Sequence, residues 1–116
     1  MLTKAQLKTW VKALRSGKFK QGIGFLYDDV EDSYCCLGVA ARVCLRKTPN
    51  QILEIGNKYF DLLSPNVMDR DTQDQFANMN DGSDKQSRKS FKQIATWIEN
   101  NLIVNNKPTE KKTKGN

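Results

Sequence analysis

Apolar residues near the start of the chain recur at helical spacing, and this pattern constrains the fold more than any other feature. Four apolar residues at positions i, i+3, i+4 and i+7 lie on one face of a helix. They are Leu7, Trp10, Val11 and Leu14. Thr3 and Gln6 have the spacing of a capping box, and Gly17 is a typical helix stop. Residues 3–15 are therefore predicted to form a helix with one buried face and a lysine-rich face in solvent.

A second amphipathic helix is predicted near the other end of the sequence. Ser90 and Gln93 repeat the capping-box spacing, and apolar residues follow at helical intervals. These residues are Phe91, Ile94, Ala95, Trp97, Ile98 and Leu102. Between the two helices, residues 37–45 have the pattern of a buried helix with Arg42 directed outward. Gly38, near its start, indicates close packing against the hairpin described below or against the first helix.

The middle of the chain gives weaker signals. Residues 47–63 contain enough apolar side chains to pack, but their period is unclear. Ser64 and Pro65 form a good N-cap and N1 pair, which predicts the start of a short helix. A helical turn is predicted over 74–79, followed by a polar loop over 80–83.

One β-hairpin is predicted in the first half of the chain. Residues 23–27 and 33–36 favour strands, and the polar turn 28–32 separates them. Together with the helices, the hairpin predicts an α+β fold. We expect residues 1–104 to form a single, mostly helical domain of four or five helices that carries one small β-hairpin.

The net charge of the chain is +6, and half of it lies at the C-terminal end. Residues 105–116 contain four lysines, one glutamate and no apolar residue, so this segment is predicted to be a disordered basic tail. The remaining body carries about +3, which is too little charge to require a nucleic-acid partner.

The sequence contains no histidine, which removes the commonest general base and the commonest zinc ligand. It also shows no carboxylate pair and no metal-ligand spacing, so we expect no enzyme, no metal site and no cofactor. The three cysteines (Cys35, Cys36 and Cys44) are odd in number and are predicted to be reduced and structural. No apolar run is long enough to span a membrane, and the N-terminal stretch lacks the apolar region of a signal peptide. A cytosolic protein is expected.

The glycine-rich loop after the first helix is the first candidate binding site. Glycine N–H groups beside Arg15, Lys18 and Gln21 could cradle a phosphate or a carboxylate. A nucleotide base could then stack on Phe19 or Tyr34. In the alternative interpretation, the glycines only form a turn and Gln21 bonds a backbone carbonyl.

Two further segments are candidates. Asn80 and Asp81 precede a capped helix and could face a ligand, although they also fit an ordinary Asx turn. Cys35 and Cys36 would be reactive only beside an electropositive group, and core packing is the alternative for both. The predicted ligand-binding residues are Arg15, Lys18, Phe19, Gln21, Gly22, Tyr34, Asn80 and Asp81.

Several of these segments together resemble a family of small proteins from tailed bacteriophages and prophages. The first is W-x-x-A-L-R-S-G-x-F-x-Q-G at residues 10–22, and the second is Y-C-C-L-G-V at 34–39. The Asn-Asp pair at 80–81 and the closing S-F-x-x-I-A-x-x-I-E at 90–99 complete the pattern. Residues 47–70 depart from the more Trp- and Pro-rich form of the family. The resemblance implies a phage origin and no particular activity.

Two classes of function remain for such a protein. In the first, it is a non-enzymatic counter-defence protein that sequesters an anionic small molecule, such as a nucleotide immune signal. In the second, it is an inhibitor that binds and blocks a host CRISPR effector, polymerase or other nucleic-acid enzyme. Direct nucleic-acid binding through the basic helix and tail is a weaker third class. In each, we expect action in the host cytoplasm without a membrane, and self-association into a homo-oligomer stays open.

Overall fold

The computed structural model describes residues 2–56 and 67–104. Its helices are α1 (Lys4–Arg15), α2 (Cys36–Val43), α3 (Pro49–Glu54), α6 (Arg70–Asp81), α7 (Phe91–Ile98) and the π-helix η1 (Glu99–Ile103). Its strands are β1 (Lys20–Gln21), β2 (Tyr27–Asp28) and β3 (Ser33–Tyr34). The prediction of a mostly helical α+β fold is confirmed. The predicted helix start at Ser64-Pro65 and the predicted tail 105–116 lie outside the described residues.

Capping boxes start the helices α1, α3 and α7. In each box, the cap hydroxyl accepts a hydrogen bond from a backbone N–H, and the glutamine side chain accepts one from the cap backbone. The pairs are Thr3–Gln6, Thr48–Gln51 and Ser90–Gln93. The first and last were predicted and are confirmed. The middle pair starts a helix inside the segment whose apolar period was unclear.

The three short strands form one sheet in the order β1-β3-β2. β2 and β3 pair antiparallel, which confirms the predicted hairpin with shorter strands. β1 pairs parallel with β3 on the other side, where a loop was expected. In the turn between β2 and β3, the carboxylate of Asp28 accepts hydrogen bonds from the backbone N–H groups of Val30 and Glu31.

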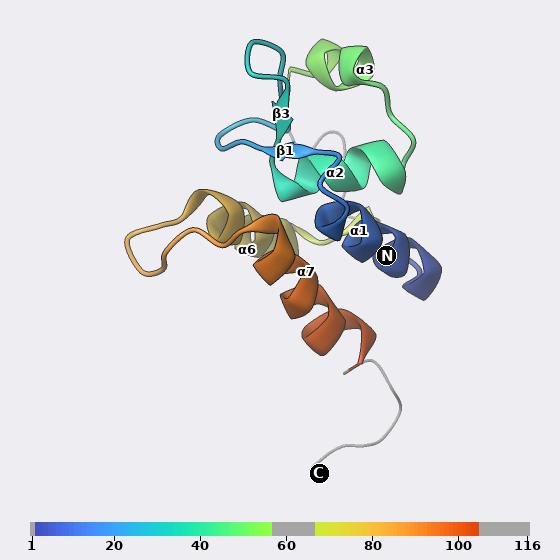
Figure 1. Ribbon diagram of the computed structural model, residues 1–116, viewed down its shortest axis with the longest axis vertical. Coiled ribbons are helices and arrows are strands. Elements are labelled where there is room, and N and C mark those ends of the chain that lie inside the picture. Colours follow the sequence, from blue (N-terminus) through green and yellow to red (C-terminus); the bar gives the residue numbers. More distant parts are fainter. Residues whose placement is uncertain (1, 57–66, 105–116) are drawn as a thin grey trace.

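α1, α2, α6 and α7 pack around one core (Figure 1). Trp10 is at its centre: its indole N–H donates to the carbonyl of Cys36 at 2.9 Å, and its ring lies 4.8 Å from that of Phe76. The sheet and α3 lie beside α2, at one end of the molecule (Figure 1). A Cβ atom at Gly38 would overlap the backbone carbonyl of Leu26, so the predicted close approach is to the segment that leads into the hairpin.

α6 is longer than predicted at both ends. It begins after Asp69, whose carboxylate accepts a hydrogen bond from the Thr72 N–H at 2.8 Å, and it ends at Gly82 with φ +84°. Asn80 and Asp81 therefore lie in its last turn, and the prediction that they belong to a polar loop is wrong. Tertiary hydrogen bonds of the Asn80 side chain, described below, override the local preference for a turn.

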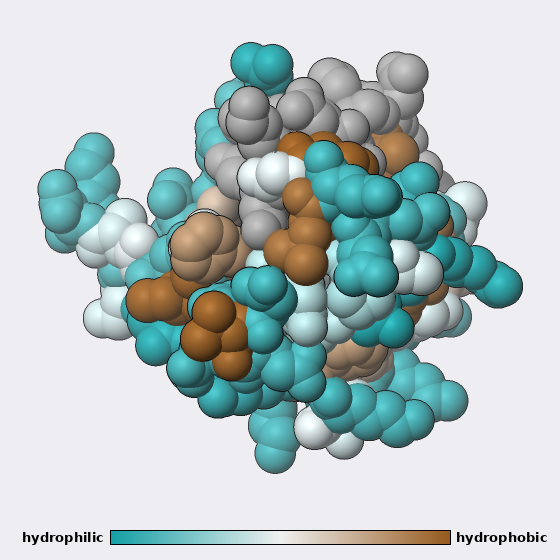
Figure 2. All heavy atoms as spheres, turned by 90° about the horizontal axis from the view of Figure 1, so that it is seen from above, coloured by the Kyte–Doolittle hydropathy of each residue, from teal (hydrophilic) through white to brown (hydrophobic). Residues whose placement is uncertain are grey.

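The loops of the sheet expose apolar side chains. Ile23 and Phe25, between β1 and β2, are about half exposed, and Val30, between β2 and β3, is 86% exposed. Viewed from the sheet end, apolar residues form brown patches within a mostly hydrophilic surface (Figure 2). Among the described residues, no helix has the length and apolar character needed to cross a membrane.

Candidate functional site

Gln21, at the end of β1, uses its side-chain amide inside the protein. Its Nε2 donates to Oδ1 of Asn80 and to the backbone carbonyl of Lys89, both at 2.9 Å. Its Oε1 accepts a hydrogen bond from the backbone N–H of Phe91 at 3.1 Å. The alternative in which Gln21 bonds a backbone carbonyl is thus confirmed. This glutamine connects the sheet to the start of α7.

Asn80 is fully buried and completes a hydrogen-bond hub with Gln21, Gly22 and Cys36. Its Oδ1 also accepts from the backbone N–H of Cys36 at 3.1 Å. Its Nδ2 donates to the Gly22 carbonyl at 2.8 Å and to Asp81 Oδ1 at 2.9 Å. A side-chain amide offers two acceptor and two donor positions, and these four bonds use all of them. The predicted residues Gln21, Gly22 and Asn80 do lie together. Their hydrogen bonds connect segments of the protein, however, and are not directed at an open site.

Asp81 is near the hub and faces the glycine-rich loop. Its carboxylate accepts a hydrogen bond from the Gly24 N–H at 3.2 Å. It also lines a hollow of about 80 Å³. The other lining residues are Gly24, Phe25, Leu26, Cys35, Leu37 and Ala77. Binding sites for small molecules usually measure roughly 300–1,000 Å³, so this hollow is too small for a nucleotide.

The two aromatic residues predicted to stack on a base are stacked within the protein. The rings of Phe19 and Tyr34 meet edge to face at 5.3 Å. The guanidinium of Arg42 lies 5.7 Å from the centre of each ring, and its Nη1 donates to the Tyr34 hydroxyl at 2.8 Å. Arg42 is therefore half-buried against aromatic rings, and the prediction that it points outward is wrong. Cation–π attraction and the hydrogen bond together account for its position.

Arg15 extends from the end of α1 to α7 and η1. Its Nη2 donates to Glu99 Oε1 at 2.7 Å and to Thr96 Oγ1 at 3.2 Å. The hydrogen bond between them raises the pKa of the Arg15 guanidinium and lowers the pKa of the Glu99 carboxyl. Lys18, the other predicted cation, is exposed in the following turn, where its backbone N–H donates to Ser16 Oγ. The structure therefore does not join these two cations to the hydrogen-bond hub.

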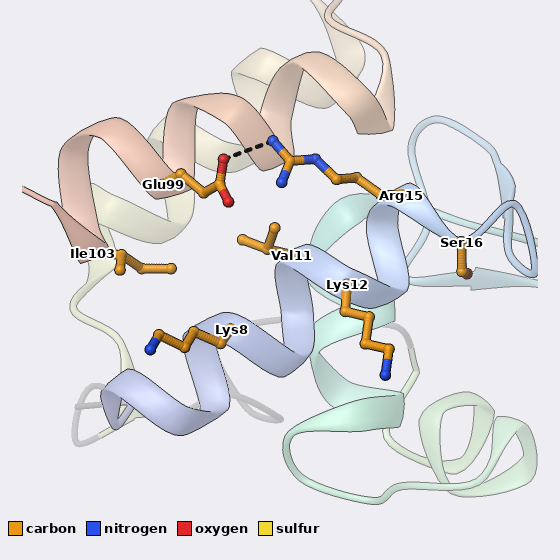
Figure 3. Close-up of a pocket in the computed structure, with 7 residues that line it drawn as sticks. All are labelled: Lys8, Val11, Lys12, Arg15, Ser16, Glu99 and Ile103. Atoms are coloured by element: carbon orange, nitrogen blue, oxygen red, sulfur yellow. Dashed lines mark hydrogen bonds and ion pairs between the residues drawn. The ribbon is translucent and has the colours of Figure 1, made fainter.

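The helices α1 and η1 enclose the α1–η1 groove, which has a volume of about 480 Å³ (Figure 3). It is lined by Lys8, Val11, Lys12, Arg15, Ser16, Glu99 and Ile103. Val11 and Ile103 lie between the helices, while the ammonium groups of Lys8 and Lys12 extend outward at the edge (Figure 3). Lysine ammonium groups on flexible stems can swing to meet an anion. The groove combines an apolar floor with a basic rim.

A second hollow, the α7 groove, runs along α7 and the start of η1 and has a volume of about 460 Å³. It is lined by Lys89, Lys92, Gln93, Thr96, Trp97, Asn100 and Asn101. Trp97 is only partly buried, and its ring meets that of Phe76 edge to face at 5.4 Å. The apolar period of the closing helix predicts Trp97 as a core residue and gives no role to Lys89 or Lys92. The signal that could have identified this surface is the run of lysines and amides on the polar side of the closing helix.

The cysteines are free thiols in apolar surroundings. Burial raises the pKa of Cys35 to about 12 and that of Cys44 to about 11, and it raises the pKa of Cys36 well above its usual value. A thiol is reactive as the thiolate, so these shifts oppose nucleophilic chemistry. Across residues 2–56 and 67–104, no three histidine, cysteine or carboxylate side chains gather into a group that could hold a metal ion.

Comparison with known proteins identifies a family for the first half of the chain. A family model described as a domain of unknown function (DUF8296) matches residues 3–67, which is more than half of the chain. The matched region contains α1, the sheet, α2 and α3, and it ends before α6 and α7. No curated protein and no solved structure matches the chain.

Proposed function

The chain belongs to the family defined as a domain of unknown function (DUF8296), and from its surface chemistry we propose that it is a non-enzymatic binding protein for a phosphate-bearing small molecule. The α1–η1 groove is the binding site. Its phosphate contacts come from Lys8, Lys12 and Arg15 rather than from the glycine-rich loop.

The single observation that carries this proposal is the lining of the α1–η1 groove. Three cationic side chains and one carboxylate, Glu99, line an open groove of about 480 Å³. That size is within the range of small-molecule sites. The Arg15–Glu99 bond fixes the guanidinium at the groove, and the remaining N–H groups of a planar guanidinium can bond a phosphate. Val11 and Ile103 supply apolar contact for the rest of the ligand.

The resemblance to phage proteins supports a role inside an infected bacterial cell. An infected bacterial cell makes nucleotide signals in antiviral defence, and a phage protein that sequesters such a signal in the host cytoplasm blocks that defence. Stoichiometric capture requires no catalytic group. High pKa values of the buried thiols are consistent with a protein that binds without reacting.

Calorimetric titration of the full chain with pyrophosphate and with mono- and dinucleotides tests the proposal. We expect Arg15→Ala and the double change Lys8→Ala/Lys12→Ala to weaken binding by roughly ten- to a hundredfold, the effect of losing charge-assisted hydrogen bonds. Arg15→Ala should leave the melting temperature almost unchanged, because an exposed ion pair contributes little to stability. Lys85→Ala, an exposed lysine outside the groove, is the control. The absence of binding to all of these ligands would overturn the proposal.

A second function, inhibition of a host nucleic-acid enzyme, is favoured by the loops of the sheet. Exposed Phe25 and Val30 lie close in sequence to the acidic turn 28–32, a combination that suits a basic protein surface. We expect the double change Phe25→Ser/Val30→Ser to abolish inhibition of the enzyme and Lys8→Ala/Lys12→Ala to preserve it. Inhibition assays on a purified CRISPR nuclease and a purified RNA polymerase measure this. Equal inhibition by both double variants would reject the loops as the contact.

A further inference from the structure

The α1–η1 groove and the α7 groove meet at one hydrogen bond. Arg15 lines the first groove, Thr96 lines the second, and the Arg15 Nη2 donates to Thr96 Oγ1 at 3.2 Å. Glu99, which also bonds Arg15, is three residues further along the same helical segment. The two grooves therefore lie along one helical segment, and the Arg15–Thr96 hydrogen bond links a residue of the first to a residue of the second. A ligand longer than one groove can contact both.

The α7 groove differs from the first in its chemistry. It contains an indole ring, two lysines and three amide side chains. Gln93 uses its oxygen to accept the Ser90 N–H, so the group it presents outside the cap is a donor. Asn101 uses its nitrogen to bond the Trp97 carbonyl, so its oxygen remains as an acceptor. Nucleotide bases stack on aromatic side chains and form hydrogen bonds with neighbouring donors and acceptors, and a partly exposed indole beside these amides offers both kinds of contact.

We infer that the two grooves form one site for phosphodiester-linked nucleosides, with phosphates at the rim of the α1–η1 groove and a base on Trp97. The inference rests on the proposed function, because it needs the phosphate contacts of Lys8, Lys12 and Arg15. It adds the base and the requirement for more than one linked nucleoside. Lys89 and Lys92 contact the phosphate that lies nearest the stacked base.

Charge and geometry favour this ligand over a simple anion. An inorganic phosphate would use only the rim lysines and Arg15, and it would leave the indole and the amides without a role. An apolar acid would use the floor of the α1–η1 groove but would not satisfy the amides of the α7 groove. A linked pair of nucleosides matches both halves, because its charge and its bases alternate along one backbone.

Tryptophan fluorescence of the full chain provides a direct readout. The protein contains two tryptophans, and Trp10 is fully buried in the core, so a ligand that changes the emission without unfolding the protein reports on Trp97. The probes are pyrophosphate, 5′-phosphorylated dithymidine dinucleotide, the same dinucleotide with abasic sugars, and hexathymidylate. We expect the dinucleotide to quench the emission and to bind roughly ten- to a hundredfold more tightly than its abasic analogue, the range for stacking on an aromatic side chain.

The variant Trp97→Phe keeps an aromatic ring against Phe76 and reduces the stacking surface. We expect it to lose most of the difference between the dinucleotide and the abasic analogue, while calorimetric titration shows unchanged affinity for pyrophosphate. Phe25→Leu changes an exposed aromatic residue outside both grooves and should leave all affinities unchanged. Thermal unfolding of each variant shows that the fold is intact.

The outcomes separate the inference from the proposed function. Equal affinity for the dinucleotide and its abasic analogue, with pyrophosphate still bound through Lys8 and Lys12, overturns the inference alone. No binding of any probe overturns both. Tighter binding of hexathymidylate than of the dinucleotide identifies a longer single strand as the source of the nucleosides, and equal binding identifies a dinucleotide. Both of these results support the shared site.

Discussion

Asn80 shows how one side chain can hold several segments in place. Through Gly22, Cys36 and Gln21 it connects α6 to the loop after β1, to the start of α2 and to β1 itself. Gln21 extends the connection to the start of α7. Only an amide supplies two donors and two acceptors at this position, because a carboxylate cannot donate and an aliphatic side chain does neither. The hub is therefore a fold determinant at the scale of a single residue.

Replacing Asn80 with alanine should destabilise the fold strongly. The change removes the partners of the Cys36 N–H and the Gly22 carbonyl, and an unsatisfied buried group costs about 1–3 kcal/mol. We expect a loss of about 2–5 kcal/mol in the free energy of unfolding, measured by urea denaturation. Asn78→Ala, an exposed asparagine of the same helix, should change it by less than about 1 kcal/mol. Similar losses for both variants would mean that the hub contributes nothing of its own.

The buried thiols predict a loss of stability at alkaline pH. The pKa of Cys35 rises from 9.0 to about 12 in the folded protein because burial disfavours the thiolate. A raised pKa contributes stability that is complete below about pH 9 and is lost as pH rises towards 12, by up to about 1.4 kcal/mol per pH unit. Urea midpoints measured from pH 7 to 11 should fall less steeply for Cys35→Ala than for the unaltered protein. Parallel curves, or rapid labelling of Cys35 by a thiol reagent at pH 8, would contradict its burial as a neutral thiol.

At the scale of elements, the sequence predicted correctly the helix starts that depend on interactions between residues close in the chain. The caps at Thr3 and Ser90 depend on residues three positions away, so α1 and α7 could be placed from the sequence. β1 could not, because its parallel partner β3 follows β2 in the sequence, so the pairing is not local. The end of α6 was missed for a similar reason, since Asn80 bonds residues 44 and 58 positions away.

In the candidate site, too, single residues could be predicted from their neighbours in the sequence, but their long-range contacts could not. Arg15 was identified from its place beside the glycine-rich loop, but its partner Glu99 lies 84 positions later and gave no signal. Gln21 and Asn80 were both predicted to bind a ligand, but the hydrogen bond between them depends on the packing of α2, α6 and α7. Polar residues predicted to bind a ligand can equally form hydrogen bonds with one another, and their spacing in the sequence does not distinguish these two outcomes.

The packing of α2 against the segment before the hairpin depends on Gly38. Any side chain at this position would overlap the backbone carbonyl of Leu26, and backbone cannot move aside as a flexible side chain can. Gly38→Ala should therefore destabilise the protein by about 3 kcal/mol or more, at the upper end of overpacking effects, as measured by thermal and urea unfolding. Gly17→Ala is the matched control, because its Cβ would meet open space and only its positive φ of +78° adds strain of about 1–2 kcal/mol. Equal effects at both glycines would show that α2 can shift without penalty.

At the scale of the whole molecule, opposite charges lie on different elements. The acidic turn between β2 and β3 is at the sheet end, and the basic rim of the α1–η1 groove lies along α1 (Figure 1). Both proposed functions use this separation, since the basic face suits phosphates and the acidic end suits a basic protein. A nucleotide bound in the grooves would leave the sheet loops free, so we expect that it would not displace a protein bound to those loops.

Removing the last twelve residues tests whether the rest of the chain folds and binds without them. Residues 105–116 carry a net charge of +3, from four lysines and one glutamate, and contain no apolar side chain to bury. Among the described residues, the buried core and the lining of both grooves lie between residues 7 and 103. We therefore expect truncation after Val104 to leave the melting temperature nearly unchanged. Affinity for pyrophosphate should also be preserved, because every residue that lines the α1–η1 groove remains in the truncated chain. Differential scanning calorimetry and titration of the truncated chain measure both, and a large drop in melting temperature would show that the last twelve residues dock on the body.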